Sequence, residues 1–402
     1  MSSEVRKPPP QFALKLKRVL GGRAGWTGLA AQVAFAAILA WIGYEFVANA
    51  RDNLETQHIA SGFGFLRNTA GFDVSQSLIP YSGTTNTYAR VFLVGLLNTL
   101  LVSVISIVFA TAIGFIIALC RLSPNWLLSR VGGIYVEIIR NLPLLFQLLF
   151  WYLAVLAALP GPRQSLSLFG AFFLSNRGLA MPRPIGEAGF SPFMAAVAIA
   201  IVGALMLRSY SRRALVERGQ GIRIWPYVLI LLIGLPLVTM LVFGLPVRFG
   251  VPELKGFNFA GGLRVTPELV ALVVALSTYT AAFIAEIVRA GIMSVHKGQM
   301  EAGSSLGLSR GTVLRLIVIP QAMRVIVPPL TNQYLNLTKN SSLAVAIGYP
   351  DLVSVFAGTT LSQTGQAIEI VAITMGVYLL LSLITSAIMS IYGWRINRSL
   401  GA

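Results

Sequence analysis

Charged residues are scarce in this sequence of 402 residues, where they make up 11%, while hydrophobic residues make up 55%. A soluble domain carries roughly a quarter charged residues, so this composition excludes an ordinary soluble globular protein. Cysteine occurs once, as Cys120, which excludes an intrachain disulfide. Histidine occurs twice, as His58 and His296, and both lie in segments expected to be loops. We therefore expect no metal site.

Motifs for nucleotide or metal chemistry are also missing. The sequence contains no G-x-x-x-x-G-K-[ST] run to hold ATP phosphates and no H-E-x-x-H run to hold zinc. The stretch GFGFLR, which begins at Gly62, has a glycine pair without the third glycine of a dinucleotide fingerprint, and it predicts a flexible loop. We expect no catalytic residue and no cofactor in this chain.

Long apolar segments are what the sequence does contain. A helix needs about 20 residues to cross a bilayer, and the runs are continuous, which excludes the alternating pattern of a membrane barrel. Segment 341–360 includes Gly348, Pro350 and Asp351, and we interpret it as a broken or re-entrant piece. We predict an all-α polytopic membrane protein with about eight transmembrane helices. The predicted spans are 26–47, 91–119, 134–159, 193–207, 225–247, 269–292, 313–337 and 367–392.

The net charge of +17 is best explained by membrane topology. Basic loops orient a polytopic chain with their positive charges inside, so we do not expect nucleic acid as a partner. Lysine and arginine follow alternate predicted spans, and they also precede the first one. These residues place both termini in the cytoplasm. The positive clusters that follow spans are Arg121 and Arg130; Arg208, Arg212, Arg213, Arg218 and Arg223; Lys297, Arg310 and Arg315; and Arg395 and Arg398.

A polar stretch, EAGSSLGLSRGTVLRLIVIPQ, interrupts the apolar runs at residues 301–321. Residues 301–308 are compatible with a short helix, Gly307 permits a change of backbone direction, and Ser309 is the predicted N-cap of a second helix. Pro320 then predicts a kink in the next membrane helix. From the residues alone, both an ordinary loop and a helix–turn–helix that passes force into the membrane remain open.

The spacing of this stretch resembles the cytoplasmic coupling motif of ABC importer permeases, which is E-A-A-x-x-x-G, then nine intervening residues, then I-x-L-P. The residues in register are Glu301, Ala302, Gly307, Ile317 and Pro320. Gly303 replaces the second alanine, and Ile319 replaces the leucine. In that family the motif docks into a groove on the ATPase subunit. The resemblance assigns coupling to Glu301, Ala302, Gly303, Leu306, Gly307, Ile317 and Pro320.

Two other stretches are similar to polar amino acid permeases. Residues 135–152 carry Arg140, Pro143 and Gln147 in the expected order, and residues 279–303 also match. This layout, with residues 65–76 and 338–352, looks like the Q-type permease subunit of general L-amino acid ABC importers. The resemblance implies a type I permease core in a bacterial inner membrane. The implied partners are a second permease, a cytoplasmic ATPase dimer that holds ATP and magnesium, a periplasmic amino-acid-binding protein and membrane lipid.

The same resemblance divides the chain into four parts. Residues 1–88 comprise a basic cytoplasmic N-terminus, an extra membrane anchor and a periplasmic loop. Residues 89–159 form the first part of the core, and residues 160–265 are inserted loops with a helix pair. Residues 266–402 form the second part of the core, with the coupling helix at 300–312.

Polar residues within the spans are candidates for a translocation pathway. A charge at the bilayer centre costs about 2.5–3.5 kcal/mol, so Glu137 with Arg140 and Glu286 with Arg289 are predicted to form ion pairs three residues apart. Asn332, Asn336 and Asn340 share one helical face, which either lines a pathway or bonds a neighbouring helix. Tyr279 and Gln147 are further pathway candidates. The rival function is an ion-gradient-driven transporter, but neither an acidic or histidine relay nor inverted repeats are evident.

Overall fold

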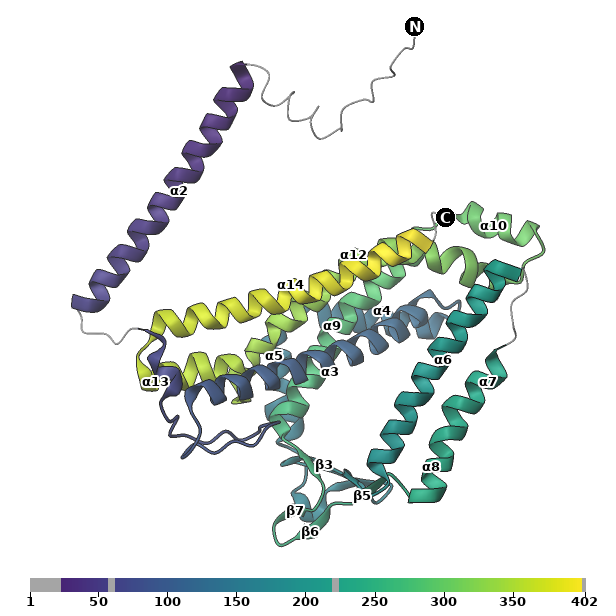
Figure 1. Cartoon of the computed structure of the whole chain (residues 1–402), viewed down its shortest axis with the longest axis horizontal. Coiled ribbons are helices and arrows are strands. Elements are labelled where there is room, and N and C mark those ends of the chain that lie inside the picture. Colours follow the sequence, from purple (N-terminus) through teal and green to yellow (C-terminus); the bar gives the residue numbers. More distant parts are fainter. Residues whose placement is uncertain (1–22, 57–61, 219–223, 400–402) are drawn as a thin grey trace.

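The computed structural model describes residues 23–56, 62–218 and 224–399, and its elements are mainly helices (Figure 1). Within these residues, seven helices are long and apolar enough to cross a membrane, and one bent helix pair raises the number to eight. The predicted all-α, multi-pass class is confirmed. The basic N-terminal residues 1–22, His58 and Arg223 lie outside the described residues.

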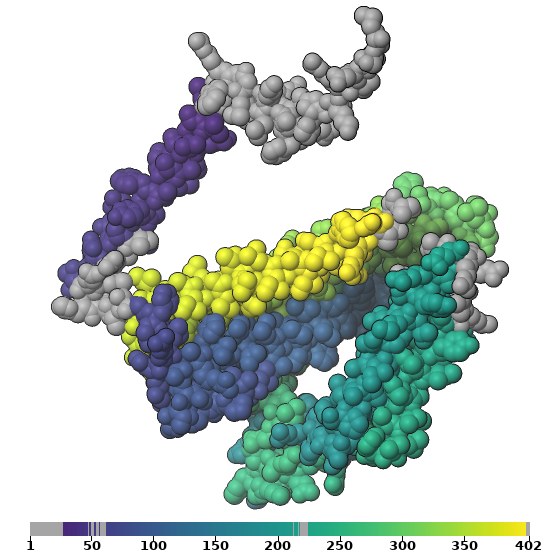
Figure 2. Space-filling view, in the orientation of Figure 1, coloured from purple at the N-terminus to yellow at the C-terminus, as the bar shows by residue number. Residues whose placement is uncertain are grey.

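The first membrane helix, α2 (Arg23–Thr56), stands apart from the rest of the chain in Figures 1 and 2. Its apolar window, Thr27–Phe46, has no buried residue. Such a surface is suited to lipid or to another helix, in keeping with an anchor added to a core.

Helices α3 (Tyr88–Leu122) and α9 (Pro267–Met293) pack together along the centre of the molecule. Small residues let their backbones approach, as is common between membrane helices. A Cβ added to Gly114 would lie 2.7 Å from the Cβ of Ile284 and 3.0 Å from the carbonyl oxygen of Ala281. The fully buried residues of the two helices include Ala110 and Ala118 of α3 and Ala281 and Ala285 of α9. Helices α12 (Ile319–Asn340) and α14 (Ala367–Ser399) complete the core.

The third predicted span, 134–159, is wrong as one continuous helix. Helix α4 (Trp126–Asn141) ends at the break, and the pair formed by α4 and Leu144–Leu156 is bent by 106°. Leu142 is extended because it precedes Pro143, whose ring disfavours helical geometry at the preceding residue. After the break come α5 (Leu144–Leu149) and the π-helical η2 (Phe150–Leu156).

Segment 341–360 does not form a ninth span among the described helices. It contains the 3-10 helix η6 (Ser341–Ile347) and the π-helical η7 (Val353–Thr360), followed by α13 (Leu361–Thr364). Asp351 between them is completely buried, where its Oδ1 accepts a 2.8 Å hydrogen bond from the Ser354 N–H. The Tyr378 hydroxyl donates to Oδ2 at 3.4 Å. These bonds fix the irregular backbone inside the protein.

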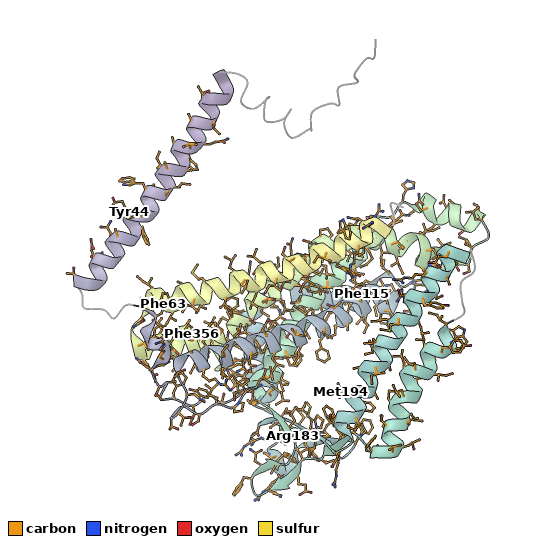
Figure 3. The ribbon with its side chains drawn as sticks, viewed as in Figure 1. Tyr44, Phe63, Phe115, Arg183, Met194 and Phe356 are labelled. Atoms are coloured by element: carbon orange, nitrogen blue, oxygen red, sulfur yellow. The ribbon has the colours of Figure 1, made fainter. Side chains whose placement is uncertain are left out.

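The flexible loop predicted for GFGFLR is also wrong. These residues form the 3-10 helix η1 (Phe63–Arg67), in which Phe65 is buried. The centroid of its ring lies 6.2 Å from those of Tyr88 and Phe356. Figure 3 shows Phe63 and Phe356 at the same end of the molecule. Aromatic packing therefore orders a segment whose glycines suggested freedom.

Residues 160–265 contain short strands that the sequence did not predict, together with the predicted helix pair. The pair comprises α6 (Phe190–Arg218) and a broken helix made of α7 (Trp225–Leu229), η4 (Ile230–Gly234) and α8 (Leu235–Phe243). The described strands are β1 (Leu166–Leu168), β2 (Phe172–Ser175), β3 (Gly178–Met181), β4 (Arg183–Gly186), β5 (Val247–Gly250), β6 (Glu253–Lys255), β7 (Asn258–Ala260) and β8 (Leu263–Val265).

The strands tie the helix pair to the core. Antiparallel pairing of β4 with β5 joins the two ends of the pair, and β3 pairs with β8 directly before α9. At Gly178, φ is 99° and an added Cβ would lie 2.1 Å from the Val265 carbonyl oxygen, so only glycine fits. Arg183 in this layer lies near Met194 of α6 in Figure 3. The helix pair appears as a separate ridge in Figure 2.

Candidate coupling helix and charged cavity

The short helix expected at 301–308 begins earlier and ends sooner, as α10 (Lys297–Ser305). His296 caps its start, where the Gly298 N–H donates to Nδ1 at 3.1 Å. Gly307 ends it with φ 75°, and the Leu308 N–H donates to the Gly303 carbonyl at 3.3 Å. Ser309 then caps α11 (Arg310–Val313), as expected, by accepting a 3.3 Å bond from the Thr312 N–H.

Gly303 is the buried contact between α10 and the membrane helix that follows. A Cβ at this position would lie 2.8 Å from Val313 Cγ2 and 3.1 Å from Ile317 Cδ1. Glycine in place of the motif's alanine thus permits close packing. The helix from Arg310 runs on through the π-helical η5 (Leu314–Val318), which directly precedes Pro320 in α12. Pro320 has no N–H to donate to the preceding helical turn, and the wider π-helical turn before it accommodates this missing hydrogen bond.

The outer surface of α10 is exposed. Glu301, Ala302 and Ser305 are exposed, and Leu306 at the tip is 79% exposed. Figure 1 places α10 at the same end of the molecule as the C-terminal ends of α14 and α6. The seven residues of the motif therefore have different positions: Gly303, Ile317 and Pro320 pack inward, Gly307 turns the chain, and Glu301, Ala302 and Leu306 face outward.

One of the two predicted ion pairs is confirmed. Glu286 pairs with Arg289, and it also pairs with Arg121 of α3, which ties the ends of α3 and α9 together. Arg121 was missed because it lies 165 residues from Glu286 and no local pattern joins them. The Glu137–Arg140 pair is wrong: among the described ion pairs these two are not partners, and Arg140 instead lies over the Phe283 ring, 5.2 Å from its centroid.

A cavity of about 910 Å³ lies where the end of α3, helix α4 and helix α9 meet. Its wall includes the Arg121–Glu286 pair and the Arg140–Phe283 contact. Charged side chains from three elements therefore face one space. The residues that line it are Arg121, Ser123, Pro124, Trp126, Ser129, Arg130, Gly133, Ile134, Val136, Glu137, Arg140, Asn141, Phe283 and Glu286.

The predicted pathway residues do not gather in this cavity. Tyr279 is the nearest, since its ring lies 5.0 Å from that of Phe283. Gln147 is buried, and its Nε2 donates to the carbonyls of Ile139 and Leu142 at 2.9 and 3.0 Å, which satisfies the end of α4. Asn332 and Asn336 are exposed on α12, and Asn340 is half-buried. Their role in a pathway remains a prediction.

These features define a class of protein. Long apolar helices form a multi-pass core, one of them is broken within the predicted membrane region, and a short helix projects beyond the spans. Broken helices and charged cavities at membrane depth are typical of membrane transport proteins.

Comparison with known proteins gives the family. Residues 110–398 match the family described as binding-protein-dependent transport system inner membrane component. A relative named as an amino-acid ABC transporter permease from Escherichia coli K12 is 54% identical over 374 residues, which are 93% of this chain and 94% of that one. The chain belongs to this family of transport permeases. It is thus a permease subunit of an ABC transporter, rather than an ion-gradient-driven transporter.

Two further relatives match over most of their length. A general L-amino acid transport system permease of Rhizobium johnstonii is 51% identical over 350 residues, covering 87% of this chain and 86% of that one. A glutamate/glutamine/aspartate/asparagine transport system permease of Rhodobacter capsulatus is 39% identical over 390 residues, covering 89% and 90%. Because the Escherichia coli relative matches 93% of this chain, that match includes most of the inserted residues 160–265.

Proposed function

We propose that this chain forms, with a second homologous permease, the membrane channel of an ATP-driven importer of L-amino acids. Three relatives that match over 86% or more of their length are named as amino-acid permeases. The proposed setting is a bacterial inner membrane, with both termini in the cytoplasm and with a periplasmic amino-acid-binding protein that delivers the substrate. The exposed Asn332 and Asn336 on α12 would then meet the second permease or the pathway between the two subunits.

The observation that carries this proposal is the geometry of α10. Its inner side packs closely against Val313 and Ile317 at Gly303. Leu306 projects from its outer tip, and this side chain is 79% exposed. A solvent-exposed leucine on a rigid, capped helix suits an apolar groove on a partner protein. The proposed partner is a cytoplasmic ATPase dimer, which holds the ATP and magnesium.

Movement of the ATPase would reach the membrane through packed side chains. When ATP binding closes the ATPase dimer, α10 moves with it, and the contact of Gly303 with Val313 and Ile317 carries the displacement into the helix Arg310–Ile347. The core then exposes the pathway to the periplasm, and hydrolysis returns it inward. The loaded binding protein shifts this equilibrium only as far as it prefers one state over the other.

Reconstitution tests the proposed function. The proteoliposomes contain this chain, the second permease and the ATPase, and loaded binding protein is supplied at the periplasmic face of the transporter. They should accumulate labelled L-glutamate only when ATP is present. Vanadate should stop uptake, and a proton uncoupler should leave it intact. Uptake that continues without ATP and stops with the uncoupler would contradict the proposal.

Replacement of Leu306 by aspartate is expected to weaken ATPase binding. An apolar anchor at the centre of an interface contributes about 2 kcal/mol or more, so affinity and uptake should fall by about 30-fold. Co-purification of the ATPase and transport by the same vesicles measure both. Leu254→Asp is the matched control, because Leu254 is an exposed leucine in β6 outside α10. Equal loss in both variants would argue against an interface at Leu306.

A further inference from the structure

Helix α4 presents a charged stripe to the cavity. Arg130, Glu137 and Arg140 are spaced by seven and three residues, which places them on one helical face, and all three line the cavity. The other charged lining residues, Arg121 and Glu286, already bond to each other. Among the described residues, Arg130, Glu137 and Arg140 have no partner of opposite charge.

The cavity reaches membrane depth. Phe283 in its wall lies ten residues before Met293, the last residue of α9, which corresponds to about 15 Å along the helix. Charged side chains at such depth avoid lipid and face water, a partner or a polar solute. The charged stripe of α4 therefore marks a polar space that extends from the α3–α4 connection toward the middle of the membrane.

Glu137 and Arg140 are one helical turn apart yet unpaired. Arg140 lies over Phe283 instead, so its guanidinium keeps free N–H donors, while the Glu137 carboxylate keeps its acceptors. An α-amino acid carries an ammonium and a carboxylate side by side. The carboxylate suits the planar fork of an arginine, and the ammonium suits a glutamate. The two side chains thus provide complementary charges at neighbouring positions on one wall.

We propose that this cavity is the inner half of the translocation pathway, in which Glu137 contacts the ammonium and Arg140 the carboxylate of the passing amino acid. This assignment rests on the proposed function. The volume of about 910 Å³ leaves room for side chains of any size. Arg130 remains unpaired after Glu137 and Arg140 contact the ammonium and the carboxylate of the amino acid. Its positive charge favours substrates with neutral or acidic side chains over substrates with basic ones. A zwitterionic lipid headgroup presents the same two charges, and the second experiment below separates the two sources.

The first experiment compares transport with ATP hydrolysis. In proteoliposomes of the complete transporter, Glu137→Gln and Arg140→Gln should each lower uptake by about tenfold, the effect of one lost charge-assisted hydrogen bond. Hydrolysis stimulated by the loaded binding protein should stay within about twofold, because α10 is untouched. Arg395→Gln, an exposed arginine of α14 outside the cavity, is the control and should change neither quantity. Unchanged uptake, or a parallel loss of uptake and hydrolysis, would overturn the proposal.

The second experiment measures occupancy without transport. In a Cys120→Ser background, Asn141→Cys places a thiol in the cavity wall, and its modification by an anionic thiosulfonate is followed without nucleotide. L-Glutamate at millimolar concentration should slow modification by about twofold or more at half or greater occupancy, and Arg140→Gln should remove the protection. Protection that follows the phosphatidylethanolamine content of the vesicles, or no protection, would overturn the proposal. The thiol-modification measurement needs no ATP. A failure of the cavity proposal is therefore distinguishable from a failure of the proposed function, which would show as absent ATP-driven uptake in the unmodified transporter.

Discussion

Replacement of Gly307 by proline is expected to abolish uptake while the permease remains in the membrane. Gly307 has φ 75°, and its N–H donates to the Ser304 carbonyl at 3.0 Å. Proline fixes φ near −65° and has no N–H, so the turn cannot form and α10 loses its orientation; interior proline costs about 3 kcal/mol. We expect uptake to fall by about 100-fold or more. Uptake in proteoliposomes, normalised to the amount of permease, measures this.

Gly311→Ala is the control for this prediction. Gly311 lies in the same polar stretch, within α11, and nothing lies within 4 Å of an added Cβ. That variant should transport normally. Near-normal uptake by Gly307→Pro would show that the conformation of the turn is not needed for coupling.

Replacement of Gly114 by leucine is expected to prevent stable packing of the core. An added Cβ would meet the Cβ of Ile284 at 2.7 Å and the Ala281 carbonyl oxygen at 3.0 Å, and neither atom is at the end of a flexible side chain. Extra methyl and methylene groups in a packed interior cost about 1–3 kcal/mol or more. The helices α3 and α9 must therefore separate. We expect a lower thermal midpoint and aggregation on size-exclusion chromatography in detergent.

Gly376→Leu is the matched control in a second membrane helix. Gly376 lies in α14, and nothing lies within 4 Å of a Cβ added there. The same substitution should leave the thermal midpoint nearly unchanged. If both variants melt alike, the close approach of α3 and α9 does not limit stability.

The sequence predicted the parts of the fold that depend on local properties. Span length is set by the bilayer, so the helices around α3, α9, α12 and α14 were predictable from continuous apolar runs. The turn at Gly307 and the helix cap at Ser309 were also predictable. Glycine tolerates positive φ, and a serine N-cap bonds to backbone N–H groups two or three residues away, so both effects are local.

Features that depend on distant contacts were not predictable. The strands are three or four residues long and several, such as β1, are exposed throughout, so no alternation reveals them. Arg121 reaches Glu286 only because α3 and α9 pack side by side. The break in 134–159 had a local signal in Pro143, but the apolar run around it favoured a continuous helix.

The position of α10 against an ATPase can be measured directly by crosslinking. In a Cys120→Ser background, Ser305→Cys places a thiol on the exposed side of α10, and Ser167→Cys in β1 serves as the control. With a short bifunctional thiol reagent and an ATPase that carries a cysteine in its groove, Ser305→Cys should yield a permease–ATPase product whose amount changes with ATP. No product from Ser305→Cys, or equal product from Ser167→Cys, would contradict coupling through this helix.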